Sequence, residues 1–268
     1  MQADYNAYLA ALSGITGVWP LTETSGTVGA ASVGTIGNVT WADNGTTILT
    51  CAGGATGPDG VAKAALNTAV AGRGGDLPTF VIPSVNTVGY WINMTSQTGA
   101  DGLAFEWAVA GFASYVQHDT GATTDIGDGV NLSAGYISIY GTTNATSHHT
   151  RASLPNSTWK FVVVVTDPSL AAGSQVKAYI DGALVGSGAG TMSPTTNATS
   201  AIAGVLCRAQ GGKGLPLTAA MNGLFLMNRA MTTTEMSAAF GKMTAASAAT
   251  GFRLPTVPNP FTAAATRR

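Results

Sequence analysis

The chain has 268 residues and a mass of 26.9 kDa, enough to bury one large hydrophobic core. Charged residues make up only 9% of it, against roughly 25% in ordinary globular domains, and the formal net charge is -1. Apart from Arg267-Arg268, lysines and arginines are scattered singly, which argues against nucleic acid as a partner. No stretch approaches the ~20 continuous apolar residues of a membrane span, so we expect no membrane partner.

The predicted elements begin with a short helix, because Tyr5, Tyr8, Leu9 and Leu12 fall at helical spacing. A strand follows at residues 18–21. Further short segments rich in β-branched and aromatic residues recur at 39–41, 47–51, 80–82, 87–94, 103–109, 136–140 and 201–207. Many short strands separated by glycine-rich turns are typical of an all-β sandwich or jelly roll.

The clearest strands lie in the second half of the chain. Residues 162–165 form an apolar β-branched run, typical of a strand buried on both faces. In residues 176–180 apolar and polar side chains alternate, and Asp181-Gly182 can form a two-residue turn before the chain returns. We therefore predict a hairpin with one solvated face.

A helix start is predicted just after a further strand at residues 224–231. Thr232 and Glu235 have the spacing of a capping box, in which each side chain satisfies a free backbone amide. Met236, Phe240 and Met243 then share one helical face. A second short helix, with one apolar side, should close the domain.

Four of these segments, in this order, are similar to the motifs of a known family. They are Gly17-Val-Trp-Pro-Leu-Thr-Glu-Thr-Ser-Gly26, Trp159-Lys-Phe-Val-Val-Val, Val176-Lys-Ala-Tyr-Ile-Asp-Gly182 and Asn228-Arg-Ala-Met-Thr-Thr-Thr-Glu235. The combination resembles the laminin-G-like, concanavalin-A-like lectin-glucanase jelly-roll domains. The resemblance spans residues 5–240, although residues 42–149 contribute strand patterning without a motif. It implies two stacked antiparallel sheets, as the patterns also suggest.

We expect one jelly-roll domain at residues 1–245 and an extended arm at residues 246–268. Prolines at 255, 258 and 260 oppose helix formation in this arm. Its apolar residues need a surface to contact, either on their own domain or on neighbouring subunits. These residues are Phe252, Leu254, Val257 and Phe261.

Catalytic chemistry is hard to find in the sequence. A glycosidase needs two carboxylates at the scissile bond, and the only glutamates are Glu23, Glu106 and Glu235. The family's opening motif accounts for Glu23 and helix capping accounts for Glu235, which leaves Glu106 without a partner. Cys51 and Cys207 are expected as buried thiols, with one disulfide as the alternative. The sequence therefore predicts a protein that is not an enzyme and that needs no cofactor.

Two candidate binding sites remain. Asp119, Asp125, Asp128 and Asn131 gather oxygen ligands on a glycine-rich loop, as calcium prefers, although aspartate is also a common turn residue. A glycan site would use exposed aromatic side chains that stack on sugar rings, and the alternative is that these residues only pack in the core. The candidates are Trp107, Tyr115, Tyr136 and Tyr140.

These observations favour a non-enzymatic structural protein of a virus particle, such as a bacteriophage capsid decoration, fibre or surface component. Its partners would be other virion subunits or copies of itself, with host surface polysaccharide as a further partner. The alternative is a free carbohydrate-binding module or adhesin outside the cell. The first residues contain no secretory signal, so such a module would have lost its signal by cleavage.

Overall fold

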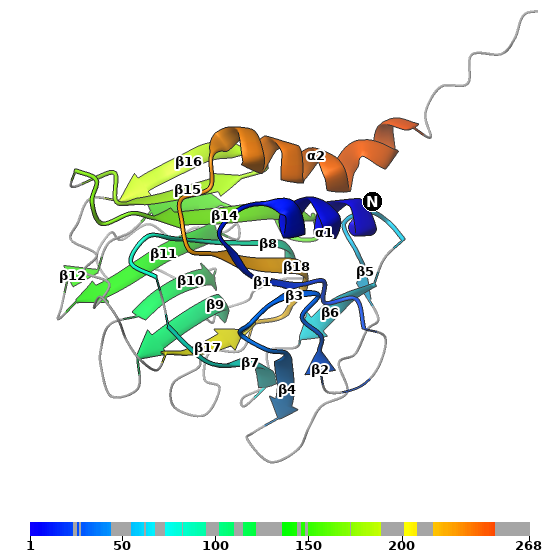
Figure 1. Cartoon of the computed structure of the whole chain (residues 1–268), viewed down its shortest axis with the longest axis horizontal. Helices are drawn as coiled ribbons and strands as arrows, with labels where there is room; N and C mark the ends of the chain where they lie inside the picture. Colours follow the sequence, from blue (N-terminus) through cyan, green and yellow to red (C-terminus); the bar gives the residue numbers. More distant parts are fainter. Residues whose placement is uncertain are drawn as a thin grey trace, which may run out of the picture.

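Two antiparallel β-sheets stack on each other and two helices cover one of them (Figure 1). The computed structural model describes residues 1–23, 26, 28–43, 55–61, 63–67, 73–81, 83–94, 102–109, 115–121, 136–143, 146–147, 150–171, 173–188, 201–207 and 217–249. The strand expected at 47–51, Cys51 and the arm residues from 250 onward lie outside these ranges.

Among the described residues, sheet A contains nine strands, from β1 near the start of the chain to β18. They are β1 (Ile15–Trp19), β3 (Val33–Gly34), β5 (Ala55–Thr56), β6 (Lys63–Asn67), β8 (Asn86–Met94), β14 (Lys160–Thr166), β15 (Val176–Ile180), β16 (Ala183–Gly188) and β18 (Ala219–Met227). The order is β16-β15-β14-β8-β18-β1-β3, with β6 paired to β18 and β5 paired to β6. Strands distant in sequence are therefore neighbours in space.

Sheet B also contains nine strands in the part of the chain that the structure describes. They are β2 (Val28–Gly29), β4 (Val39–Asp43), β7 (Arg73–Phe80), β9 (Gly102–Val109), β10 (Tyr115–Gly121), β11 (Tyr136–Thr143), β12 (Thr146–Ser147), β13 (Thr150–Ser153) and β17 (Ala201–Val205). The order is β12-β11-β10-β9-β17-β7-β4-β2, with β13 paired to β11. The predicted all-β, antiparallel jelly-roll sandwich with short terminal helices is confirmed.

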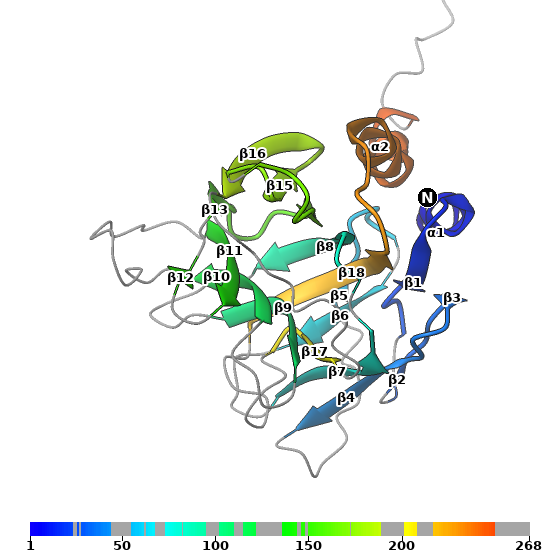
Figure 2. The ribbon, with the colours of Figure 1, turned by 60° about the vertical axis from the view of Figure 1, so that its left-hand side comes forward.

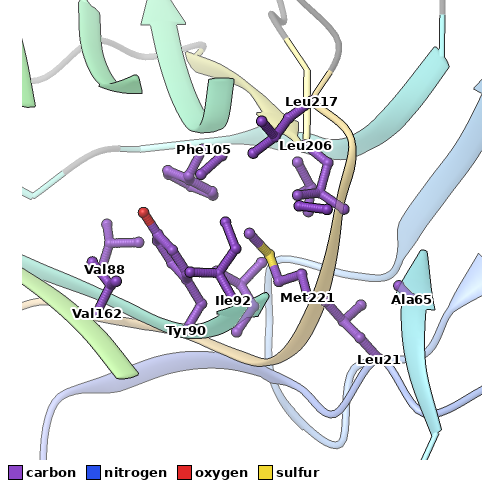
Figure 3. Close-up of a cluster of buried hydrophobic side chains, with 14 of the residues drawn as sticks. Leu21, Ala65, Val88, Tyr90, Ile92, Phe105, Val162, Leu206, Leu217 and Met221 are labelled. Atoms are coloured by element: carbon purple, nitrogen blue, oxygen red, sulfur yellow. The ribbon is translucent and has the colours of Figure 1, made fainter. Parts of the chain in front are cut away.

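The main hydrophobic core lies between the two sheets, and we call it the inter-sheet core (Figure 3). Tyr90, Ile92 and Met221 extend into it from sheet A, and Phe105 extends into it from sheet B; each is at most 1% exposed. Burial raises the pKa of Tyr90 well above its ordinary value, because the phenolate would lose its hydration there. Interdigitated side chains from facing strands hold the sheets together.

A second core, the helix-side core, seals the other face of sheet A. Helices α1 (Gln2–Ala11) and α2 (Thr233–Ala249) lie side by side on this face, away from sheet B (Figure 2). Tyr5 is fully buried there, and its hydroxyl donates to the carbonyl of Gly223 at 3.0 Å. Trp91 and Phe240 stack with ring centroids 5.6 Å apart. Because both faces of sheet A are covered, residues 162–165 are buried throughout, as predicted.

The predicted hairpin at β15 and β16 forms, with one correction. Asp181 and Gly182 have φ angles of 53° and 82°, so the two-residue turn uses the left-handed conformation that was expected. The Asp181 carboxylate accepts from the Phe161 amide at 3.0 Å and from the Lys160 ammonium at 2.6 Å. Tyr179, however, is only 8% exposed, because the helix-side core reaches beneath it. The face predicted to be solvated is therefore partly covered.

Candidate functional site

Sheet B has one face turned away from the inter-sheet core, which we call the outer face. Among the described residues, it is the only sheet face that is covered neither by the helices nor by one of the two cores. Trp41 and Leu77 lie on the core face and are 4% and 3% exposed. Their neighbours in sequence alternate to the other side. Thr40 is exposed and Asp76 is partly exposed.

One cross-strand row of the outer face contains several polar residues. Each member pairs in register with the next, and paired residues of neighbouring strands occupy the same face. From β4 to β11 the row runs through Thr40, Asp76, Gly204, Glu106, Gln117 and Tyr140. Residues that are up to 164 positions apart in sequence, Thr40 and Gly204, thus occupy one row.

The strand register assigns the four aromatic residues of the predicted glycan site to two different faces of sheet B. Tyr115 lies two residues before Gln117 on β10, and Tyr136 lies four residues before Tyr140 on β11, so these tyrosines occupy outer-face positions. Trp107 pairs with Ala203, which is 1% exposed in the inter-sheet core. The position of Trp107 is therefore on the core face, opposite the three tyrosines.

Of the expected calcium ligands, only Asp119 is among the described residues. It pairs with Ser138 on β11, and Ser138 pairs with Arg151 on β13, so these three positions form another row of the outer face. Asp125, Asp128 and Asn131 lie outside the described residues. Within the described ranges, no three His, Cys, Asp or Glu residues are grouped as a metal site would need. Calcium binding stays a prediction.

Glu235 lies on the helix side of sheet A, where its carboxylate accepts several hydrogen bonds. Its carboxylate accepts from the Thr232 amide at 2.9 Å, and the Thr232 hydroxyl accepts from the Glu235 amide at 3.2 Å, which confirms the capping box. The sequence analysis missed Arg229, which donates to both carboxylate oxygens at 2.9 and 2.6 Å and to the Ser13 carbonyl at 2.9 Å. The hydrogen bonds from Arg229 lower the pKa of Glu235 to about 2.

Glu23 and Cys207 also have structural contacts. Glu23 accepts from the Ala30 amide at 2.7 Å and so orders the segment before β3. Cys207 is buried, as expected, and its thiol contacts the Gly75 carbonyl at 3.6 Å. Glu106 is thus the one glutamate that belongs to the outer face. The sequence analysis overlooked Asp76 and Gln117, because only the strand register brings them into line with Glu106.

Comparison with known protein families shows which family the chain belongs to. The family model described as the concanavalin A-like lectin/glucanases superfamily matches residues 72–237. The chain belongs to this superfamily. The match includes β7, β9, β10, β11 and β17, and therefore includes the row from Asp76 to Tyr140. No curated protein sequence matched this superfamily member.

Solved structures with the same fold include two from glycoside hydrolases. Domain 4 of AbnA, a GH43 extracellular arabinanase from Geobacillus stearothermophilus in complex with arabinotriose, is 15% identical with a TM-score of 0.55. The alignment covers 84% of this chain and 97% of that one. Trypanosoma rangeli sialidase in complex with sialic acid is 12% identical with a TM-score of 0.54. That alignment covers 91% of this chain but only 37% of the sialidase chain.

The prediction that this superfamily member is not an enzyme is wrong, because it excluded an activity that the comparisons leave open. It was drawn from the lack of a second acid beside Glu106, yet matching structures come from an arabinanase and a sialidase. Identities of 15% and 12% transfer the fold and no activity. In addition, Asp76 occupies the same row as Glu106. An enzymatic role is therefore open to experiment.

The comparisons leave the cellular setting undecided. They contain no virion protein among the neighbours described above, and they identify no partner chain. Among the described residues, no helix has the length and apolar character needed to span a membrane.

Proposed function

We propose that this protein binds carbohydrate on the outer face of sheet B. The observation that carries the proposal is the strand register that gives Tyr115, Tyr136 and Tyr140 one common face. Sugar sites combine aromatic rings, which stack on the apolar side of a pyranose or furanose, with nearby groups that bind hydroxyls. Gln117 and Glu106, two residue types that bind hydroxyls, occupy positions in the same row as Tyr140.

The comparisons support this proposal at the level of the family. The superfamily is named for lectins and glucanases, both of which act on sugars. Domain 4 of AbnA matches nearly over its full length and was solved with arabinotriose. A soluble oligosaccharide of this kind is therefore a reasonable first ligand to test.

The test is a titration with arabinotriose, preceded by a glycan array to find stronger ligands. Tyr115→Ala, Tyr136→Ala and Tyr140→Ala should each weaken binding of the best ligand about tenfold, since one ring contact is worth about 1.4 kcal/mol. Leu184→Ala is the control, because Leu184 is 56% exposed on β16 of sheet A. It should leave the affinity unchanged.

Two results would contradict the proposal. The protein could bind no glycan on the array, in which case carbohydrate recognition is the wrong function. Alternatively, it could bind a glycan with the same affinity in all three tyrosine variants, in which case the site lies elsewhere. Thermal unfolding of each variant separates a lost contact from a lost fold.

For the setting of this binding we propose a structural subunit on the surface of a virus particle, such as a bacteriophage capsid decoration or fibre. Support comes from the low charge of the chain and from the apolar, proline-containing arm, which suits contact with neighbouring subunits. The alternative is a free binding module or adhesin acting outside the cell. The two settings differ in whether the arm is required for assembly.

Light scattering of the full chain and of a chain ending at residue 249 distinguishes them. If the arm joins subunits, the full chain should form an oligomer and the shortened chain a folded monomer. A monomer in both forms favours the free module. The shortened chain keeps all of α2, so its fold should be intact.

A further inference from the structure

Strand β16 forms one edge of sheet A and exposes large apolar side chains. Among the described residues, β16 is paired with β15 alone, and the nearby β13 of sheet B is paired with β11. Leu184 is 56% exposed and Val185 is 36% exposed. The strand, Ala-Leu-Val-Gly-Ser-Gly, contains no charged residue and no proline. Charged residues and proline usually protect edge strands from further pairing, so β16 is suited to accept another strand.

A β-bulge explains why two consecutive apolar residues are exposed on β16. Leu184 pairs with Tyr179 on β15. The next pair joins Gly186 to Ala178, so Val185 has no residue opposite it. In a regular strand, successive side chains point to opposite faces, and one of the two apolar side chains would enter the inter-sheet core. The bulge instead leaves both of them at the surface.

The C-terminal arm contains a segment that fits such an edge. Residues 252–257 are Phe-Arg-Leu-Pro-Thr-Val, and Pro255 is the one proline among them. The backbone amides of alternate residues in a strand point to the same neighbouring strand, and proline has no amide hydrogen to donate. With Pro255 on the open side, the amides of Phe252, Leu254 and Thr256 all point to β16. Pro255 then also prevents a further strand from adding.

The position of α2 determines which copy of the chain can supply this segment. A Cβ added to Gly182, in the turn before β16, would lie 3.9 Å from the Cα of Ser237 near the start of α2. Ala249 ends α2 about 18 Å farther along the helix axis, and β16 points away from that end (Figure 1). Phe252 can lie at most about 11 Å from Ala249. The segment of the same copy therefore cannot lie along β16, whereas that of a second copy can.

We propose that β16 binds residues 252–257 of a second copy of this chain as an added strand of sheet A. Backbone hydrogen bonds between the two strands supply the affinity, and Leu254 lies opposite Leu184 so that the two apolar side chains cover each other. This inference rests on the proposal that the arm joins subunits, and it adds the surface that receives the arm.

Light scattering of the full chain over a range of concentrations tests the receiving strand. Leu184→Lys should raise the concentration at which copies assemble at least about tenfold, because a lysine on an edge strand opposes pairing. Val61→Lys is the matched control, because Val61 is 80% exposed and lies outside β16. It should leave assembly unchanged. Thermal unfolding should show that both variants keep the fold.

Changes in the arm test the pairing itself. Thr256→Pro removes an amide that points to β16, and it should weaken assembly about tenfold as well. Arg253→Pro removes an amide on the open side, and it should change assembly less than about threefold. Leu254→Glu should weaken assembly in the wild-type protein but restore it in Leu184→Lys, since the two side chains lie opposite each other.

The outcomes separate the two proposals. If the full chain assembles through its arm but Leu184→Lys assembles like the wild-type protein, the inference is overturned and arm-mediated assembly stands. If Arg253→Pro and Thr256→Pro weaken assembly equally, strand pairing is overturned. If the full chain is a monomer, both the inference and arm-mediated assembly fail, while the glycan titration tests carbohydrate binding independently.

Discussion

The contact between Arg229 and Glu235 should contribute measurably to stability, and its loss can be followed with pH. The hydrogen bonds from Arg229, together with those of Thr232, lower the pKa of Glu235 from 4.5 to about 2. Each tenfold change in proton affinity is worth about 1.4 kcal/mol, so the full difference corresponds to about 3 kcal/mol. The Glu235 side chain is 21% exposed, and solvent screening reduces this to about 2 kcal/mol.

Glu235→Gln should therefore lower the free energy of unfolding by about 2 kcal/mol at pH 7. Because the pKa of the folded protein lies below that of the unfolded chain, the stabilisation is complete above about pH 4.5. It disappears as the pH falls towards 2. Urea unfolding at pH 7 and at pH 2.5 measures both ends of this range. The stabilities of the wild-type protein and the variant should converge in acid.

Asp4→Asn provides the control, because Asp4 is an acid on α1 whose side chain is 71% exposed. This variant should change the free energy of unfolding by less than about 0.5 kcal/mol. If Glu235→Gln is as stable as the wild-type protein at pH 7, the ion pair contributes nothing. If the variant is less stable by the same amount at both pH values, the loss comes from packing or capping. Either result would refute the electrostatic account.

Three further outcomes are expected. Gly89→Ala should destabilise the protein by about 1–3 kcal/mol, because an added Cβ would lie 2.3 Å from the Phe225 ring; an unchanged midpoint in urea would show that this ring moves freely. Tyr5→Phe should cost about 1 kcal/mol through the lost hydrogen bond to Gly223, measured in the same way, and no loss would mean that the bond adds nothing to stability. If reducing-sugar assays detect cleavage of a polysaccharide, Asp76→Asn and Glu106→Gln should each abolish it, since hydrolysis needs two carboxyl groups; cleavage that survives in both variants would place the chemistry elsewhere.

Local patterns were enough to predict much of the fold. The β-branched run at residues 162–165, the Asp181-Gly182 turn and the Thr232-Glu235 capping box depend on residues close in sequence, and each was found as predicted. The burial of Tyr179 was missed because it depends on α2, which packs on this face from a distant part of the chain. The alternation of polar and apolar residues within one strand does not indicate which distant elements pack on that strand.

For the same reason, less of the candidate site could be predicted from the sequence. Glu106 was recognised as an unassigned acid, but Asp76 and Gly204 were not connected with it. They lie on β7 and β17, and β17 pairs with both β7 and β9 although it follows them by many residues. Likewise, Trp107 and Tyr115 were grouped by residue type, whereas register assigns them to opposite faces. Strand order is a long-range property that a single sequence does not encode in local spacing.

The helix-side core also has a consequence for how the protein is made. Tyr5, from the first helix, packs in the same core as Met236 and Met243, from the last one. During synthesis this layer cannot close until almost all of the described chain has left the ribosome. Until then, Trp91, Phe161 and Phe225 on the strands beneath have no cover, and the nascent chain exposes a broad apolar surface. Assistance by chaperones would thus be needed late in synthesis, and premature termination before α2 should give aggregates.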